Sequence, residues 1–274
     1  MAQNKYHIVP FPKFNRSAVD AGRLGRHKHI MHALIEVDVT KARRFIREHR
    51  QLTGEKLSFT AFVINCLGKA VEQNKRLQAF RNWRGQLVIL EDVPIKAMLE
   101  VEKDGKKLPF PHIFRSVNHK NYRDIHQELR TAQQNYHNEK GMAYMRIFLK
   151  LPWFIRRFFY WLVTKVPTIF PQYTSEVMVT AVGMFFDGVG WGIPKPNNTL
   201  TVALGPIVEK PVVRKGQIVI REIMHVTLSI NHDIVYGAPA ARFSKYFKEL
   251  IESGYGLTKR DDLTEKKENL ITTK

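Results

Sequence analysis

The order of strand and helix patterns along the chain predicts an α/β fold with a large mixed β-sheet flanked by helices. The chain has 274 residues, of which 44% are hydrophobic, and this composition is typical of a globular protein with a sizeable core. No Pro/Gly/Ser-rich or low-complexity linker divides it. We therefore expect a single domain over residues 1–255, followed by a charged, disordered tail at 256–274.

The first residues of the chain are basic and have no regular pattern. Strand and helix patterns begin after them. Residues 30–39 have the pattern of a strand, and Thr40 begins a helix that reaches about His49. Ser58 is a good N-cap for a second helix. The apolar face of that helix contains Phe59, Phe62, Val63, Cys66, Leu67, Ala70 and Val71.

The middle of the chain predicts two turns between strands. Residues 79–101 indicate a hairpin, with its turn at 83–85, and then another strand. Asp104-Gly105 is a strong turn signal because both residues tolerate positive φ. We expect the return strand over 112–116 and a polar, exposed helix over 121–138.

The C-terminal part predicts strands followed by one helix. Strand patterns cover 176–183, 199–208 and 217–230. The last two strands form a hairpin through residues 214–216. Residues 238–253 form an amphipathic helix that Gly254 ends.

Residues 142–165 form an aromatic and basic segment within a longer stretch, 139–175. Lys150, Pro152 and Arg156 interrupt its apolar run, so it is too short and too charged to span a bilayer, which needs roughly 20 apolar residues. Aromatic side chains interleaved with Arg and Lys are typical of a helix in a membrane interface. A helix packed on the domain, or one lining an apolar substrate tunnel, fits the same pattern.

Charge, cysteine and histidine content limit the function classes. Forty-four Lys and Arg residues against 25 Asp and Glu give a net charge of +19, which attracts nucleic acid, anionic membranes or a phosphate-bearing cofactor. The single cysteine, Cys66, is expected to be buried and inert. His27, His29 and His32 lack a Cys or carboxylate at matching spacing, so we expect no metal site. The first residues have no apolar signal core, and we expect a cytoplasmic protein.

One histidine, His232, has a context that favours catalysis. It follows a strand pattern and precedes a glycine and a helix, so a strand-to-helix turn would hold its imidazole at the edge of the sheet. Histidine is the side chain best matched to proton transfer near neutral pH.

Two segments carry a family resemblance. His232, Gly237, Ala238 and Ala-Ala-Arg-Phe at 240–243 match a C-terminal signature, and VMVTAVGMF (177–185) with TLTVALGPIVEKPVV (199–213) match a second block upstream. The chain thus resembles the catalytic core of the dihydrolipoyl acyltransferases of 2-oxoacid dehydrogenase complexes, which share their fold with chloramphenicol acetyltransferase. The resemblance covers roughly residues 25–255 and departs from the family at 139–175.

The resemblance implies an activity and an assembly. It implies a homotrimer whose active sites lie between subunits, where His232 would take the proton from the thiol of coenzyme A or dihydrolipoamide. Thr180 matches the position whose hydroxyl donates to the oxyanion, and Gly183 matches the glycine after that strand. Acyl-CoA would then be a substrate, and no metal would take part.

The chain also departs from the signature at three positions. Tyr236 stands where the family has Asp or Asn, Asn231 replaces Asp, and Asp233 replaces Arg. We expect no lipoyl domain and therefore a small-molecule or lipid-like acceptor. The alternatives are a catalytically silent protein that binds acyl-CoA or a membrane and, weakest, a basic nucleic-acid-binding protein, for which no recognition motif is present.

Overall fold

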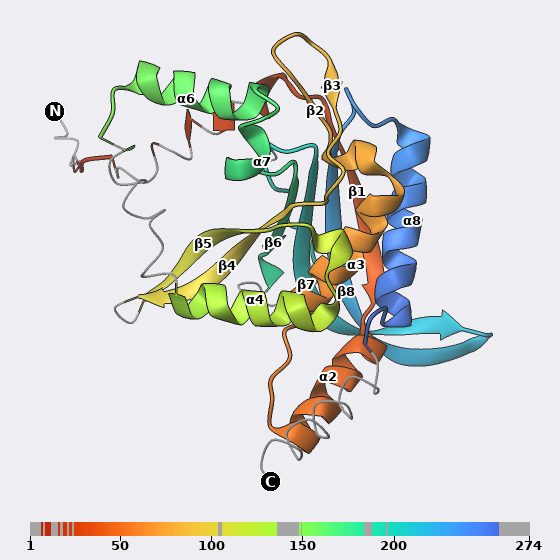
Figure 1. Ribbon diagram of the computed structural model, residues 1–274. Helices are drawn as coiled ribbons and strands as arrows, with labels where there is room; N and C mark the ends of the chain where they lie inside the picture. The colour runs from red at the N-terminus through yellow and green to blue at the C-terminus, as the bar shows by residue number, and fades with distance from the viewer. Residues whose placement is uncertain are drawn as a thin grey trace, which may run out of the picture.

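The computed structural model describes residues 7, 9–11, 16, 19–20, 22–23, 25–103, 106–135, 148, 150–183, 188–195 and 197–257. A six-stranded sheet forms one layer, and helices pack against one of its faces (Figure 1). This arrangement confirms the predicted α/β class.

The sheet is mixed. Its strands, in chain order, are β1 (Ile30–Asp38), β4 (Ile95–Lys103), β5 (Lys106–Phe114), β6 (Val177–Ala181), β7 (Leu200–Arg214) and β8 (Gln217–Asn231). In space the order is β1-β8-β7-β6-β4-β5. The strand β6 runs parallel to both β4 and β7, and the other pairs are antiparallel. A separate short ladder joins β2 (Phe80–Arg81) to β3 (Leu87–Val88).

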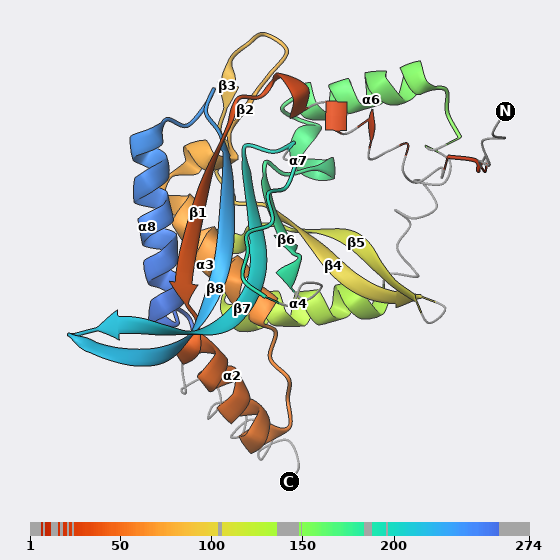
Figure 2. The same ribbon diagram turned by 180° about the vertical axis from the view of Figure 1, so that it is seen from behind.

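The described helices cover one face of the sheet (Figure 1 and Figure 2). The long helices are α2 (Thr40–Thr53), α3 (Phe59–Gln73), α4 (Tyr122–Asn135), α6 (Trp153–Lys165) and α8 (Gly237–Ser253), and α7 (Phe170–Tyr173) is short. Short 3-10 turns lie at Gly25–His27, Lys75–Gln78 and Val117–His119. Figure 2 shows the opposite face of β1, β8 and β7, over which none of the described helices lies. We call this the open face.

Local chemistry sets the ends of the elements as predicted. The Ser58 hydroxyl accepts a hydrogen bond from the Ala61 N–H at 3.2 Å and so caps α3. Gly254 ends α8 with a φ of 73°, a left-handed conformation that glycine adopts at little cost. Lys215 and Gly216, with φ of 50° and 79°, form the turn between β7 and β8.

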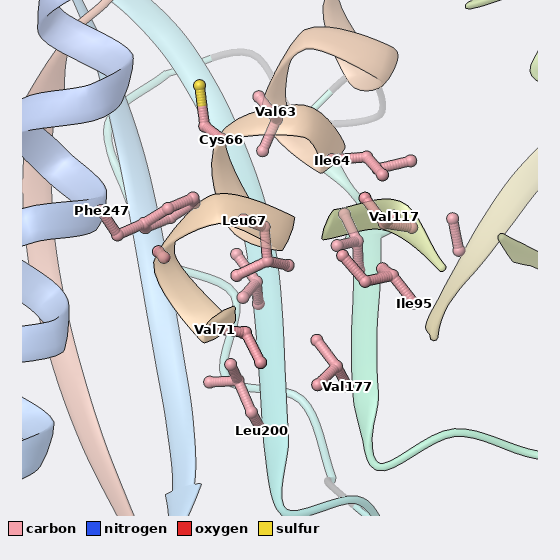
Figure 3. Close-up of a cluster of buried hydrophobic side chains, with 14 of the residues drawn as sticks. Val63, Ile64, Cys66, Leu67, Val71, Ile95, Val117, Val177, Leu200 and Phe247 are labelled. Carbon is pink, nitrogen blue, oxygen red and sulfur yellow. The ribbon is translucent and has the colours of Figure 1, made fainter. Parts of the chain in front are cut away.

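The core lies between the sheet and α3. Figure 3 shows Leu67 and Val71 of this helix beside Leu200 of β7, with Phe247 of α8 on the other side. Cys66 is fully buried in the same cluster, and burial raises the pKa of its thiol. The prediction of a buried cysteine is confirmed, and a raised thiol pKa disfavours the reactive thiolate.

Three predicted elements need correction. The helix α4 is not simply exposed, because its polar sequence contains an apolar stripe at helical spacing. The buried residues of α4 are Tyr122, Ile125, His126, Leu129 and Ala132. The strand β5 begins at Lys106 instead of 112, since it pairs with β4 along its whole length. The strand expected after the turn at 83–85 is reduced to Leu87–Val88.

Some predictions fall outside the described residues. These concern the Asp104-Gly105 turn, the start of the aromatic segment at 142–147, and the tail from 258 onward. Among the described helices, none has the length and apolar character needed to cross a membrane. The described residues also contain no group of three or more side chains suited to hold a metal ion.

Candidate active site

The turn that carries His232 is held by main-chain hydrogen bonds. The His232 N–H donates to the His29 carbonyl at 2.7 Å, and the Asn231 N–H donates to the Thr199 carbonyl at 2.9 Å. The Asn231 carbonyl accepts from the N–H groups of Ile234 and Val235. Three segments distant in sequence therefore fix the backbone from which the imidazole projects.

The His232 side chain is exposed and its ring nitrogens are free within the described part of the chain. Its ring lies edge-on to the ring of Tyr236, with centroids 5.6 Å apart at 72°. Such a geometry is favourable for aromatic pairs. An imidazole that is braced by a ring and still accessible is suited to accept a proton from a bound substrate.

The residues around His232 have separate roles. The Asn231 side chain is buried and accepts a hydrogen bond from the Asp233 N–H at 3.1 Å. The Asp233 carboxylate does not turn toward His232, because it accepts a hydrogen bond from His29 Nδ1 at 2.7 Å. That hydrogen bond holds the pKa of Asp233 below its ordinary value. Asp233 therefore braces the turn through His29.

The two supporting residues at the start of α8 have few contacts. The Tyr236 carbonyl accepts the first helical hydrogen bond from the Ala240 N–H at 3.1 Å, while its side chain makes no capping bond. Gly237 has open space where a Cβ would stand. Packing alone therefore does not require a glycine at this position.

Thr180 and Gly183 lie elsewhere in the sheet. Strand alternation directs Val177 and Val179 into the core and Thr180 toward the open face, where it is half-buried. A Cβ added to Gly183 would stand 2.0 Å from the Gly205 carbonyl oxygen. The close approach of these two backbone segments explains why glycine occupies position 183.

One chain does not bring Thr180 and His232 together. Thr180 pairs with Ala203, and Ala203 pairs with Thr227 of β8. Thr227 precedes His232 by five residues, which is about 16 Å along an extended strand. The sheet thus holds the two predicted site residues at different levels and two strands apart.

The open face of β8 is polar although it is buried. His225, Thr227 and Ser229 alternate along the strand and are at most 1% exposed. Trp191 packs against the His225 ring, with centroids 4.4 Å apart, and donates a hydrogen bond to the Ile35 carbonyl. Within the described residues, His225 Nδ1 and the Thr227 hydroxyl have no hydrogen-bond partner, whereas His225 Nε2 lies 3.5 Å from Glu36 Oε1.

Sequence reasoning missed His29 and the polar row on β8. The contact between His29 and Asp233 joins residues 204 positions apart, and nothing in the local pattern around His29 indicates it. The row on β8 did leave a signal, because His225, Thr227 and Ser229 alternate with apolar residues. That alternation indicates a strand with one polar face.

Comparison with known proteins shows which family the chain is similar to. Residues 173–258 match the catalytic domain of the 2-oxoacid dehydrogenase acyltransferases. The matched region includes Thr180, His232 and Tyr236, and it confirms the resemblance expected from the sequence. The lipoamide acyltransferase component of the branched-chain alpha-keto acid dehydrogenase complex of Pseudomonas putida is 32% identical over 78 residues. That alignment covers 28% of this chain and only 18% of the relative.

Solved acyltransferase structures have the same fold over nearly the whole chain. A probable dihydrolipoamide acetyltransferase from Listeria monocytogenes superposes with a TM-score of 0.67 at 18% identity, covering 90% of this chain and 95% of the other. The Azotobacter vinelandii dihydrolipoamide acetyltransferase gives a TM-score of 0.69 at 15% identity, covering 92% and 94%. The latter structure was used to study a serine, a histidine and an asparagine in catalysis.

Proposed function

We propose that the protein is an acyltransferase that moves an acyl group between coenzyme A and an acceptor, with His232 as general base and Thr180 as oxyanion donor. The sequence separations between the candidate site residues carry the proposal. In the Azotobacter vinelandii enzyme, the serine, histidine and asparagine studied for catalysis are separated by 52 and 4 positions. Thr180, His232 and Tyr236 have the same separations, which supports assigning a hydroxyl and an imidazole to equivalent places in a chain of the same fold.

The reaction follows from these two groups. His232 takes the proton from the acceptor, whose freed electron pair attacks the thioester carbonyl of acyl-CoA. The carbonyl oxygen becomes an oxyanion, to which the Thr180 hydroxyl donates a hydrogen bond; such a preorganised donor contributes roughly 3–4 kcal/mol. When the intermediate collapses, the thiolate of coenzyme A leaves and takes the proton back from the imidazolium. Every bond and proton is accounted for without a covalent enzyme intermediate.

We further propose that the active site forms between two copies of the chain in a homotrimer. The register of the sheet supports this, because it keeps Thr180 about 16 Å along the strand direction from His232 of the same chain. A neighbour laid against the open face would bring its own His232 to Thr180.

A specific observation favours a second candidate, a catalytically silent protein that binds acyl-CoA. Tyr236 replaces the amide of the Azotobacter vinelandii enzyme, and its hydroxyl makes no hydrogen bond within the described residues. A phenol donates and accepts through a single oxygen, whereas an amide carries its donor and its acceptor on two separate atoms. The basic surface suits the phosphates of coenzyme A in either case.

The acceptor is proposed to be a free small molecule or a lipid-like molecule. The exposed position of His232 at the end of β8 supports an acceptor that enters from outside the fold. The aromatic helix α6 lies at the same end of the sheet as the start of α8 (Figure 1), which supports an apolar acceptor.

Thiol release tests the proposal. The protein is incubated with acetyl-CoA and longer acyl-CoAs against thiol, hydroxyl and amine acceptors, and free coenzyme A is detected with a chromogenic thiol reagent. We expect turnover that His232→Ala lowers by roughly 10²–10⁴. The exposed His119 provides a control, because His119→Ala removes a histidine remote from the turn.

Each other result has a defined meaning. Turnover that survives His232→Ala would show that another group is the base. Coenzyme A binding by calorimetry without any turnover would favour the silent candidate. Salt-sensitive binding of DNA, with no binding of coenzyme A, would favour a nucleic-acid-binding protein.

A further inference from the structure

Helix α6 turns a row of aromatic side chains toward solvent. Phe154, Phe158 and Trp161 follow each other at helical spacing and are 57%, 63% and 45% exposed. The rings of Phe158 and Trp161 stack with centroids 6.0 Å apart. We call these three residues the α6 stripe. Large apolar side chains gathered on one exposed helix face mark an interaction surface, whereas single ones do not.

The opposite side of α6 carries a buried ion pair. Arg156 and Asp20 are both buried, and the guanidinium donates to the carboxylate at 2.8 and 2.9 Å. Arg156 also donates to the Leu151 carbonyl at 2.8 Å. Rotating the helix to hide its stripe would therefore expose Val163 and break a buried charge pair, which is costly. The outward direction of the stripe is thus built into the packing.

An arginine-rich pocket of about 410 Å³ lies between α6 and residues of the N-terminal segment. Its walls include Arg16, Arg23, Arg156, Arg157, Asp20 and Trp153, and we call it the arginine pocket. The charge of Asp20 is matched by Arg156, and Arg157 stacks on the Trp153 ring at 4.9 Å. In the described part of the chain, the other three arginines have no carboxylate partner.

We propose that the α6 stripe and the arginine pocket together bind an anionic phospholipid membrane. Aromatic rings partition to the boundary between headgroups and acyl chains, and guanidinium groups beside them meet the lipid phosphates. The 13 residues of α6 span about 20 Å along the helix axis. The helix therefore lies along the membrane surface.

Charge argues for this occupant against a second copy of the chain. A symmetric contact of this face with itself would bring the unpaired arginines of both pockets together, and like charges at an interface are destabilising. A phospholipid surface supplies the negative charge that the arginine pocket lacks. The acyl chains of the lipids cover the α6 stripe.

Docking in this way would present the candidate active site to the membrane. The Lys165 carbonyl at the end of α6 accepts a hydrogen bond from the Trp83 N–H of the β2–β3 hairpin, and Lys165 donates to the Arg81 carbonyl. Arg81 in turn acts electrostatically on Asp233, next to His232. These contacts join the docking surface to the His232 turn.

Vesicle flotation tests the proposal without any acyl-CoA, so its outcome is independent of the proposed function. The full chain is floated with vesicles of phosphatidylglycerol and phosphatidylcholine, or of phosphatidylcholine alone. We expect binding to the anionic vesicles, and at least tenfold weaker binding for the double variant Phe158→Asp/Trp161→Asp. Arg157→Glu should also weaken binding. Leu52→Asp, at an exposed apolar residue of α2, should bind like the parent.

Two results would overturn the proposal. One is equal binding of the parent and the double variant to anionic vesicles, or no binding by either. The other is a parent that does not bind vesicles together with a double variant whose oligomeric state, measured by light scattering, differs from that of the parent. That result would assign the stripe to a contact between copies. Circular dichroism confirms that the compared variants are folded.

Discussion

Thr180 lies in β6 and His232 directly follows β8 of the same sheet, yet the register sets Thr180 level with Thr227, five residues before His232. Thr180 faces the open side of the sheet, and His232 projects from its end. A transfer that uses both groups therefore requires them to come from different chains. The proposed mechanism can therefore be tested with oligomers that contain two different variants of the chain.

Mixed oligomers should recover activity from two inactive variants. Thr180→Val and His232→Ala are unfolded, mixed in equal amounts and refolded together. In a randomly mixed trimer about a quarter of the interfaces pair an intact threonine with an intact histidine, so about a quarter of the parent rate should return. Thiol release measures the rate. Each variant refolded alone is the control, and a mixture no faster than the variants would place both residues in one chain.

The hydroxyl of Thr180 should matter more than its shape. Thr180→Ser keeps an oxyanion donor and is expected to retain most activity. Thr180→Val keeps the volume and the strand preference but loses the hydroxyl, so kcat should fall by roughly 10²–10³. Steady-state kinetics separates the two. Equal rates for the Ser and Val variants would show that this side chain only packs in β6.

Local signals explain what could be predicted. Ser58, Gly254 and the Lys215-Gly216 turn act through their own backbone and nearest neighbours, so their residue types were enough to place three element ends. The apolar stripe of α4 followed the same rules but was hidden among charged residues. His232 could be selected as a candidate because the strand, the turn and the helix around it are consecutive in sequence.

Contacts between distant segments explain what could not be predicted. The pairing of His29 with Asp233 depends on the register of β1 against β8, which one sequence does not reveal. The level of Thr180 relative to His232 likewise depends on two strand pairings in succession, β6 with β7 and β7 with β8. The outward direction of the α6 stripe depends on the ion pair between Arg156 and Asp20, which are 136 positions apart in sequence. In each case the deciding partner lies outside any local pattern.

The ring of Tyr236 should contribute to kcat, and its hydroxyl should not. Tyr236→Phe keeps the edge-on contact with His232, so kcat should stay within about twofold of the parent. Tyr236→Ala removes a contact worth about 1 kcal/mol and frees the imidazole, so kcat should drop by up to tenfold. Thiol release at saturating acyl-CoA provides kcat. A Phe variant as slow as the Ala variant would give the hydroxyl a role.

Asp233 should stabilise the protein only above acidic pH. The hydrogen bond from His29 lowers the pKa of Asp233 from its ordinary 3.8. A carboxylate with a depressed folded-state pKa stabilises the fold above the unfolded pKa, and the stabilisation is lost as pH falls through the folded value. Asp233→Ala should therefore lower the denaturation midpoint at pH 6, and the difference should shrink below about pH 4. A constant difference would contradict this; Glu249→Ala, at an exposed carboxylate, is the control.

Gly183 and Gly237 should respond oppositely to alanine. At Gly183 the new methyl would meet the Gly205 carbonyl oxygen at 2.0 Å and the Pro206 nitrogen at 2.6 Å. These are backbone atoms that cannot rotate away, so Gly183→Ala should lower the free energy of unfolding by about 1–3 kcal/mol. At Gly237 the methyl meets nothing within 4 Å at the start of α8. Gly237→Ala should therefore be neutral or stabilise by about 0.5 kcal/mol. Urea denaturation measures both, and a neutral Gly183→Ala would mean that the loop after β6 can move away from β7.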